Sequence, residues 1–205
     1  MSKMILIAAL SYLLGSVPFG YLLVRIFRGE DVRQSGSGNI GATNVSRTSA
    51  VLGVTTLVLD ALKGAIAVVL AARLAGGINS GLKPYQPMAM AAFFAVLGHA
   101  FPVWLKFCGG KGVATALGSF LVINPGTVFF ATVIFIFIVI VFRYVSLGSI
   151  IAVALFPLFF LRGTHGGART FAFVAGTSLL IIARHRQNIL RLCAGSENRV
   201  GAKRV

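Results

Sequence analysis

The sequence predicts an all-α integral membrane protein with seven transmembrane helices, one of them short, in a single domain covering residues 1–205. The chain is 57% hydrophobic and has a mean hydropathy of +0.91, which is too apolar for a soluble domain of ordinary composition. Apolar stretches of membrane-spanning character recur along it, separated by Gly, Pro or basic residues. Basic residues also concentrate on one side of the topology that these stretches produce.

Seven apolar stretches follow one another along the chain. Residues 4–24 precede Arg25 and lack the small-residue cleavage site of a signal peptide, so we expect a retained transmembrane helix there, with its N-terminus external. The stretch 113–123 would extend only about 16 Å as a helix, against a hydrocarbon core of about 30 Å, so it is either a short span or a re-entrant segment. The remaining stretches are 51–74, 88–105, 127–142, 145–161 and 170–183.

The distribution of basic residues decides between these alternatives. With seven crossings and an external N-terminus, most Lys and Arg residues face the cytoplasm, as the positive-inside rule requires. If residues 113–123 did not cross, the basic C-terminal tail would lie outside, away from the other polar motifs. Seven crossings are therefore favoured, with the C-terminus cytoplasmic. They place three motif segments on the cytoplasmic face: residues 35–47, 98–115 and 185–197.

The charge balance restricts the possible partners. Only 4 acidic residues stand against 19 basic ones, for a net charge of +15, which favours membrane lipids with anionic headgroups or an anionic substrate. The basic residues are scattered between apolar spans, so we expect no nucleic acid partner. Cys108 and Cys193 have neither the spacing of a zinc site nor that of a disulfide framework, and we expect no metal and no cofactor.

The first motif segment contains SGSGNIGATNVSR at residues 35–47. Gly36, Gly38 and Gly41 match the pattern G-x-G-x-x-G, with Asp60 roughly 20 residues further on, but no strand precedes them and Asp60 lies in an apolar span, so a dinucleotide site is rejected. A flexible connecting loop and an anion-binding loop remain as alternatives. Binding is favoured by side chains that offer more hydrogen bonds than a connector needs: Ser37, Asn39, Thr43, Asn44 and Arg47.

The second segment contains GGKGVAT, which directly precedes an apolar helix. The amides of this loop and the helix N-terminus can hold a phosphate while Lys111 neutralises it. Leu105 stands where a Walker motif needs Gly, so hydrolysis of a nucleoside triphosphate is disfavoured. The alternative is a tight turn with a snorkelling lysine.

The third segment begins HRQN. His185 and Asn188 are three residues apart, so a helix would place them on one face, with Arg186 and Arg191 beside them. A basic cap that ends the last span explains the arginines as well, but it explains neither His185 nor Asn188.

Two charges lie inside the second span. Asp60 and Lys63 are three residues apart, and because isolated charges are costly in a membrane, such a pair marks either a functional site or a structural ion pair. We favour the structural role. His99, at a predicted helix end, is expected to be a hydrogen-bonded core histidine.

The residue inventory also limits the chemistry. The chain has few carboxylates for a nucleophile and base mechanism, and no His is followed five residues later by Asp, which excludes the His-Asp pair of the widespread glycerolipid acyltransferases. An activated phosphate donor suits positive charge and amide hydrogen bonds better.

Four motifs in order resemble those of the bacterial PlsY family, the acyl-phosphate:glycerol-3-phosphate acyltransferases. They are GSGNIGATNVSR at residues 36–47, LDALKG at 59–64, GHAFPVWLKFCGGKGVAT at 98–115 and HRQNILRLCAGSE at 185–197. With the fitting length and hydropathy, the resemblance spans essentially the whole chain. Cys108 departs from it, because the family often has a basic residue there, and this changes the local charge.

The resemblance implies transfer of a fatty acyl group from acyl-phosphate to the 1-hydroxyl of glycerol 3-phosphate. The products would be lysophosphatidic acid and phosphate, in the first acylation of phospholipid synthesis at the bacterial cytoplasmic (inner) membrane, without a cofactor. The rival hypotheses are a membrane transporter of an organic phosphate and a non-catalytic scaffold.

Site residues carry over by motif. The proposed catalytic residues are Ser37, Lys111, His185 and Asn188, with either a donor phosphate oxygen or His185 accepting the proton. Glu197 joins Asp60 and Lys63 as a structural residue. The expected substrate-binding residues are Gly36, Gly38, Asn39, Gly41, Thr43, Asn44, Arg47, Gly109, Gly110, Gly112, Thr115 and Arg186.

Overall fold

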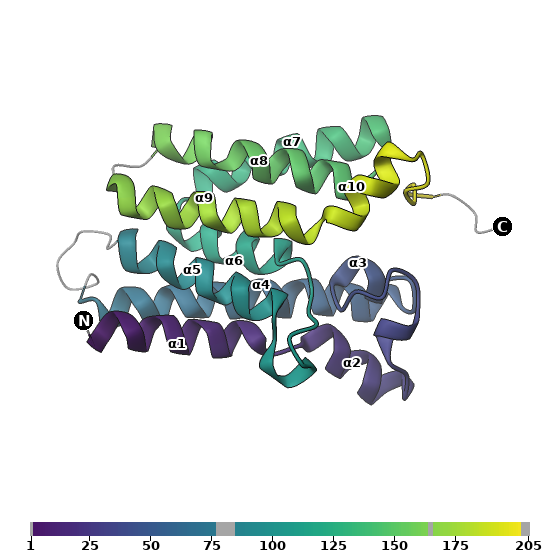
Figure 1. The fold of residues 1–205 in the computed structure, drawn as a ribbon, viewed down its shortest axis with the longest axis horizontal. Helices are drawn as coiled ribbons and strands as arrows, with labels where there is room; N and C mark the ends of the chain where they lie inside the picture. Colours follow the sequence, from purple (N-terminus) through teal and green to yellow (C-terminus); the bar gives the residue numbers. More distant parts are fainter. Residues whose placement is uncertain (1, 77–84, 164–165, 202–205) are drawn as a thin grey trace.

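The computed structural model describes residues 2–76, 85–163 and 166–201, and these ranges contain helices and connecting segments but no strand (Figure 1). The longer helices are α1 Ser2–Ser16, α2 Phe19–Arg28, α4 Ala50–Leu74, α5 Tyr85–Ala100, α6 Val113–Ile123, α7 Pro125–Phe142, α8 Val145–Gly163 and α9 Gly167–Arg184. The shorter ones are η1 Val32–Gln34, α3 Ala42–Val45, η2 Val103–Leu105 and α10 Arg186–Cys193.

The predicted set of spans is confirmed. In the described ranges, 6 helical stretches are long and apolar enough to cross a membrane, when α1 and α2 are taken together as Lys3–Arg28, and α6 is a shorter apolar helix. The bounds of α6 coincide with the predicted stretch 113–123. Gly112 precedes this helix in a left-handed conformation, with φ of 88°, and Asn124 and Pro125 follow it, so its short length is set by residues at both ends.

The prediction of one continuous helix over residues 4–24 is wrong. The helix breaks at Val17 and Pro18, because proline lacks an N–H donor and disfavours a helical conformation of the residue before it. The break takes the Val17 carbonyl out of the helical hydrogen-bond pattern, and this carbonyl accepts from the N–H of Phe19 at 3.2 Å. Lys63 of α4 supplies a second donor, with Nζ 2.8 Å from the Val17 oxygen.

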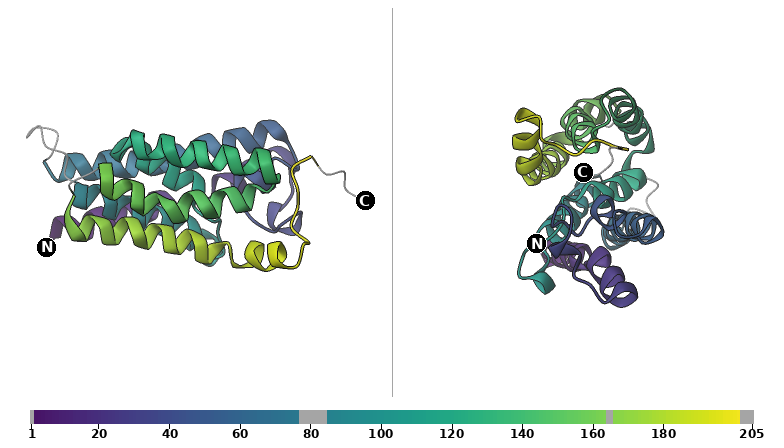
Figure 2. Two further views of the ribbon diagram at one scale, coloured as in Figure 1. Left: turned by 90° about the horizontal axis from the view of Figure 1, so that it is seen from above. Right: turned by 90° about the vertical axis from the view of Figure 1, so that its right-hand side faces the viewer.

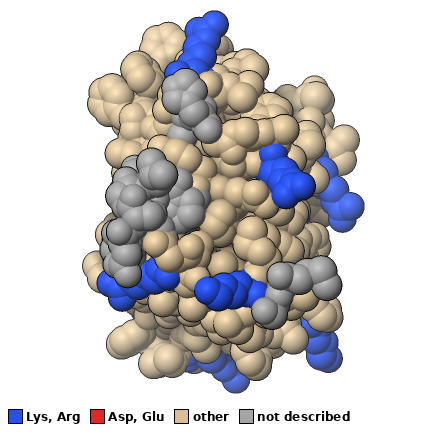
Figure 3. Space-filling view, turned by 90° about the vertical axis from the view of Figure 1, so that its left-hand side faces the viewer, with Lys and Arg blue, Asp and Glu red and all other residues tan. Residues whose placement is uncertain are grey.

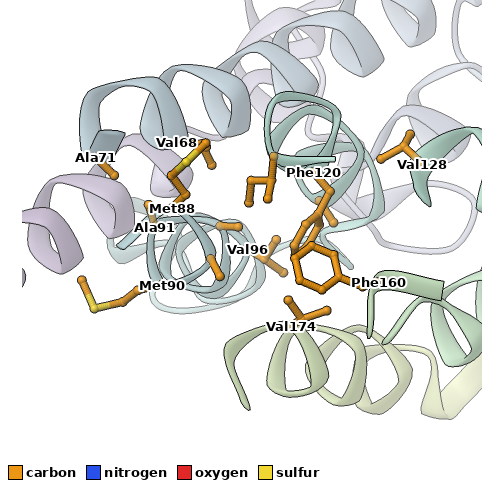
Figure 4. Packing of buried hydrophobic residues seen from close by; sticks show 14 of the residues in the cluster. Val68, Ala71, Met88, Met90, Ala91, Val96, Phe120, Val128, Phe160 and Val174 are labelled. Carbon is orange, nitrogen blue, oxygen red and sulfur yellow. The ribbon is translucent and has the colours of Figure 1, made fainter. Parts of the chain in front are cut away.

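Helix α5 is central to the bundle and contacts α1, α4, α6 and α9. Figure 4 shows the apolar core around it, where Val68, Val96, Phe120, Phe160 and Val174 come from five different helices. Aromatic rings fill the space between α6 and α8. These helices thus form one continuous packed core.

Helices α4 and α6 cross so closely that their backbones touch. A Cβ atom on Gly118 would overlap the backbone of Ala61, and one on Gly64 would overlap the carbonyl oxygen of Thr115. Small residues at such crossings are typical of membrane helices, because van der Waals contact between backbones replaces the hydrophobic effect as the source of association.

The three motif segments lie at the same end of the bundle. Helices α2, α3 and α10 and the connection that follows α5 gather there in Figure 1 and in the left view of Figure 2. The opposite end is mostly uncharged where it is described, with scattered Lys and Arg side chains and no Asp or Glu in view (Figure 3). The fold therefore concentrates its polar groups at one end.

We expect Gly118→Ala to destabilise the protein, because its new methyl group would meet the α4 backbone, which cannot rotate away. Overpacking of this kind typically costs about 1–3 kcal/mol. Gly126→Ala is the matched control, since a Cβ there would lie 3.4 Å from the side chain of Asn124, an ordinary contact. The thermal unfolding midpoints of both variants in detergent check the prediction, and equal midpoints would contradict it.

Candidate active site

Charged residues from all three motif segments converge around Lys111. The pKa of Lys111 is lowered to about 8, chiefly by burial and in smaller part by the positive charges of Arg191, Arg47 and Arg184, while the negative charge of Glu197 opposes the change. Residues that are far apart in the sequence are therefore close enough to act on one ammonium group.

Asn44 organises the first segment from inside. It is only 2% exposed, its Oδ1 accepts from the backbone N–H of Ser37 at 2.8 Å, and its Nδ2 donates to the carbonyls of Val32 and Ser35 at 3.0 and 3.1 Å. Both donors of this amide are used within the loop. Asn44 was expected among the substrate-binding residues, but here it holds the loop in shape.

The glycines of this loop make room for Arg47 and for the turns. A Cβ on Gly36 would lie 3.0 Å from Nη1 of Arg47, and Gly36 and Gly38 have φ of 60° and 69°, a region that favours glycine. Asn39 Oδ1 accepts from the N–H of Gly41 at 2.9 Å. The side chains of Ser37, Thr43 and Arg47 are exposed.

The second segment is a glycine loop with two fixed peptides. Arg184 donates from Nη2 to the carbonyl of Gly109 at 2.9 Å and from Nε to the carbonyl of Gly110 at 3.1 Å. The N–H of Gly110 donates to the carbonyl of His99 at 3.0 Å. Sequence reasoning missed Arg184, because the last residue of an apolar span is also explained as a stop-transfer arginine.

The end of this loop lies within the bundle. A Cβ on Gly112 would be 2.6 Å from Val96 of α5 and 3.7 Å from Ile181 of α9, and each of these residues lies about one turn before its helix ends. This depth accounts for the desolvation of Lys111. In the described part of the chain, the N–H groups of Lys111 and Gly112 meet no hydrogen-bond acceptor, so they are free for an anion at the start of α6.

Thr115 was expected to bind substrate, but the structure places it against α4. It is 0% exposed, its carbonyl faces Gly64, and no described residue provides a hydrogen-bond partner for its hydroxyl.

His185 of the third segment is buried, with its Nδ1 2.8 Å from the carbonyl oxygen of Ile181. Because a carbonyl only accepts, Nδ1 carries the proton and Nε2 keeps its lone pair. Burial and the charge of Lys111 lower the pKa of His185 to about 4, against the opposing effects of the Ile181 hydrogen bond and of Glu197. His185 is therefore a neutral imidazole at physiological pH.

Glu197 fixes the orientation of Asn188. Its Oε1 accepts from Asn188 Nδ2 at 2.7 Å and from Ser146 Oγ at 3.0 Å, and its Oε2 accepts from Arg191 Nε at 2.7 Å. Burial alone would raise the pKa of Glu197, but the hydrogen bonds from Arg191, Asn188 and Ser146 outweigh it and hold this pKa below its usual value. The ionised carboxylate binds the amide nitrogen of Asn188, which leaves Asn188 Oδ1 as an acceptor.

A C-terminal strap, residues 196–200, keeps Glu197 in place. Val200 exchanges hydrogen bonds with Arg143 at the turn between α7 and α8: its N–H donates to the Arg143 carbonyl and its carbonyl accepts from Arg143 Nη2, both at 2.7 Å. Arg199 donates to the hydroxyl of Tyr144 at 2.8 Å. Ser146 and Arg143 are therefore supporting residues that the motifs did not indicate.

Beneath the glycine loop lies a buried ion pair. Lys63 Nζ is 2.7 Å from Asp60 Oδ1 and 3.0 Å from Nδ1 of His99, in addition to its bond with Val17.

Arg186, expected to bind substrate, is exposed and makes no side-chain hydrogen bond to another described residue. The site thus combines several cations and free amides with one carboxylate that is already paired, an arrangement suited to phosphate.

Comparisons with known proteins show the family to which the chain belongs. The family model for glycerol-3-phosphate acyltransferase matches residues 5–195. A glycerol-3-phosphate acyltransferase of Syntrophotalea carbinolica is 49% identical over 195 residues, which cover 94% of this chain and 95% of that protein. One of Ehrlichia canis is 44% identical over 194 residues, which cover 95% and 97%.

Two crystal structures of PlsY, an integral membrane glycerol 3-phosphate acyltransferase, have the same fold. The glycerol 3-phosphate form has a TM-score of 0.88 and 38% identity, with 97% of this chain and 96% of that chain covered. The lysophosphatidic acid form has a TM-score of 0.85 and 36% identity, with 97% and 95% covered. The chain therefore belongs to the PlsY family of integral membrane glycerol-3-phosphate acyltransferases.

Proposed function

We propose that this protein transfers a fatty acyl group from acyl-phosphate to the 1-hydroxyl of glycerol 3-phosphate, forming lysophosphatidic acid and phosphate on the cytoplasmic side of a bacterial membrane. The supporting observation is the desolvated Lys111 beside N–H groups at the start of α6 that meet no acceptor among the described residues. The glycerol 3-phosphate and lysophosphatidic acid forms of PlsY support the same acceptor and product.

Two anionic groups have to be held together in this reaction. We assign the phosphate of the donor to Lys111, the free amides that follow Gly110, and the exposed loop with Ser37 and Asn39. Glycerol 3-phosphate enters from the cytoplasm and is held by Arg47, with its reacting hydroxyl toward His185 and Asn188. The acyl chain of the donor lies between helices in the bilayer.

Acyl transfer breaks the bond between the carbonyl carbon and the bridging phosphate oxygen. The hydroxyl oxygen of glycerol 3-phosphate attacks that carbon, and phosphate leaves with the bonding electrons. Lys111 and the amides stabilise the charge that develops on the leaving phosphate, and their dry surroundings strengthen this effect. The site thus favours the transition state through charges already in place.

The proton of the attacking hydroxyl goes to an oxygen of the departing phosphate. His185 is the competing acceptor, since its Nε2 has a free lone pair, but a pKa of about 4 makes it a weak base at neutral pH. His185 therefore accepts a hydrogen bond from the hydroxyl and orients it.

An organic-phosphate transporter is the rival function. Transporters bind substrate near the bilayer midplane, between repeated halves. Here the polar segments lie at one end of the bundle (Figure 1) and the sequence has no visible repeat, so catalysis is favoured.

The reaction itself is tested with purified protein in lipid, supplied with palmitoyl-phosphate and glycerol 3-phosphate. We expect release of phosphate together with lysophosphatidic acid, and no product from acyl-CoA as a parallel donor. Product from acyl-CoA alone would overturn the proposed donor. If neither donor gives product and liposomes take up glycerol 3-phosphate, the protein is a transporter.

Lys111 is expected to limit activity at alkaline pH. Below about pH 8 its ammonium is charged, and as pH rises through this value the charge is lost, so kcat/KM falls with an apparent pKa near 8. Lys111→Ala should remove most turnover, whereas Lys111→Arg should lower the rate but keep its charge and lose the alkaline decline. Lys106→Arg, an exposed control near the same loop, should leave the profile unchanged; an unchanged profile in Lys111→Arg would exclude Lys111 as the titrating group.

His185→Gln separates the two proton acceptors. If His185 were the general base, its loss would cost about 10²–10⁴-fold in turnover. We expect turnover to fall less than about 10²-fold, because only the orientation of the hydroxyl is impaired. The pH–rate profiles of the wild type and of His185→Gln should then have the same limbs. A larger loss together with a vanished acidic limb would assign the base to His185.

A further inference from the structure

The pair of peptides at Gly109 and Gly110 is held on one side by Arg184. The guanidinium binds both carbonyls at once, at 2.9 and 3.1 Å, and stacks on Phe101 with Cζ 5.0 Å from the ring centroid. A planar guanidinium with two parallel donors fixes the orientation of two acceptors, which a single ammonium cannot do. Arg184 lies at the end of α9, so it ties the loop to that helix.

His99 holds the same peptides from the other side. Its carbonyl accepts from the N–H of Gly110 at 3.0 Å, and its ring lies directly against this residue, because a Cβ on Gly110 would overlap Nε2. A Cβ on Gly109 would in turn overlap the carbonyl oxygen of His99. The loop therefore needs glycine at both positions to pack on His99.

The imidazole of His99 is itself fixed by Lys63. An ammonium has three donors and no acceptor, so Nζ donates to the Val17 carbonyl and to Nδ1 of His99, and it forms an ion pair with Asp60 Oδ1. The ring is therefore in the tautomer with its proton on Nε2. It cannot rotate without breaking a network whose Asp60, Lys63 and His99 side chains are at most 4% exposed.

The result is a loop in which the carbonyl oxygens of Gly109 and Gly110 are already bound, while the N–H groups of Lys111 and Gly112 meet no acceptor in the part of the chain that the structure describes. Carbonyl oxygens facing a phosphate would repel it, and N–H groups attract it. We propose that Arg184 and His99 are positioning residues for acyl transfer, which hold the Gly109–Gly110 peptides so that the loop presents N–H groups to the phosphate of the substrate. The inference rests on the proposed function, in which neither Arg184 nor His99 touches the substrate.

Arg184→Lys and Arg184→Gln test the role of the guanidinium. Both lose the paired hydrogen bonds, and we expect kcat/KM for palmitoyl-phosphate to fall about 10²-fold in each, as for a misplaced catalytic group. The Gln variant also removes a charge that lowers the pKa of Lys111, so its alkaline limb should move to higher pH, while the limb of the Lys variant stays in place. Arg169→Lys and Arg169→Gln, at the exposed far end of the same helix, are the matched controls and should change neither quantity.

A double-mutant cycle tests the contact between His99 and Gly110. Gly110→Ala should remove most activity, because its methyl group would overlap the imidazole. His99→Asn keeps an acceptor for Lys63 near the position of Nδ1 and removes the Nε2 edge of the ring, so the double variant should regain activity relative to Gly110→Ala. Losses that simply multiply in the double variant would show that the ring does not set the position of the loop.

Two further measurements separate this inference from the proposed function. The ratio of variant to wild-type kcat/KM is measured with whichever acyl donor the wild type uses, so a wrong donor leaves the comparison intact. Inorganic phosphate should raise the thermal unfolding midpoint of the wild type and raise that of Arg184→Lys less. Wild-type kcat/KM in Arg184→Lys, or a loss that only matches the fraction of unfolded protein, would overturn the positioning role.

Discussion

Backbone polar groups at membrane depth need partners within the protein, and Lys63 shows how much of this fold depends on that requirement. Pro18 breaks the first span and takes the Val17 carbonyl out of the helical hydrogen-bond pattern. Lys63 reaches it from α4 and at the same time bonds Asp60 and His99. One ammonium group thus joins the broken first span, α4 and α5 directly below the glycine loop.

The motif segments follow the same rule through single buried or half-buried polar side chains. Asn44 satisfies the backbone of the first loop, and Glu197 gathers Asn188, Arg191 and Ser146 at the third. Asn44 and Glu197 each bind neighbours in their own segment, so other polar groups of the segment stay available for a ligand. The site therefore has many cations, and its carboxylate, Glu197, already accepts three hydrogen bonds.

The sequence was a good guide where local chemistry decides the outcome. The bounds of α6 were predictable because Gly112 and the Asn124–Pro125 pair end the helix on both sides, and hydropathy gave the spans. The prediction was wrong at Pro18, because the apolar character of residues 4–24 gave no sign of the helix break there. The roles of Asn44, Arg184 and Ser146 could not be predicted from the sequence, because their partners come from distant segments or from backbone atoms that only the folded chain brings near. Lys111 was proposed from its glycine loop alone, and its desolvation depends on the depth of that loop in the folded chain.

That depth has a consequence for how the two substrates of the proposed reaction meet. Gly112 lies beside Val96 and Ile181, inside the ends of α5 and α9, so a phosphate bound at the proposed site would lie below the plane of the helix ends. In the proposed reaction, a donor with a fatty chain would arrive by two-dimensional diffusion in the leaflet, and its headgroup would not have to leave the membrane. The water-soluble acceptor would have to move down to this depth, and the product, which then carries the chain, would be released directly into the lipid phase.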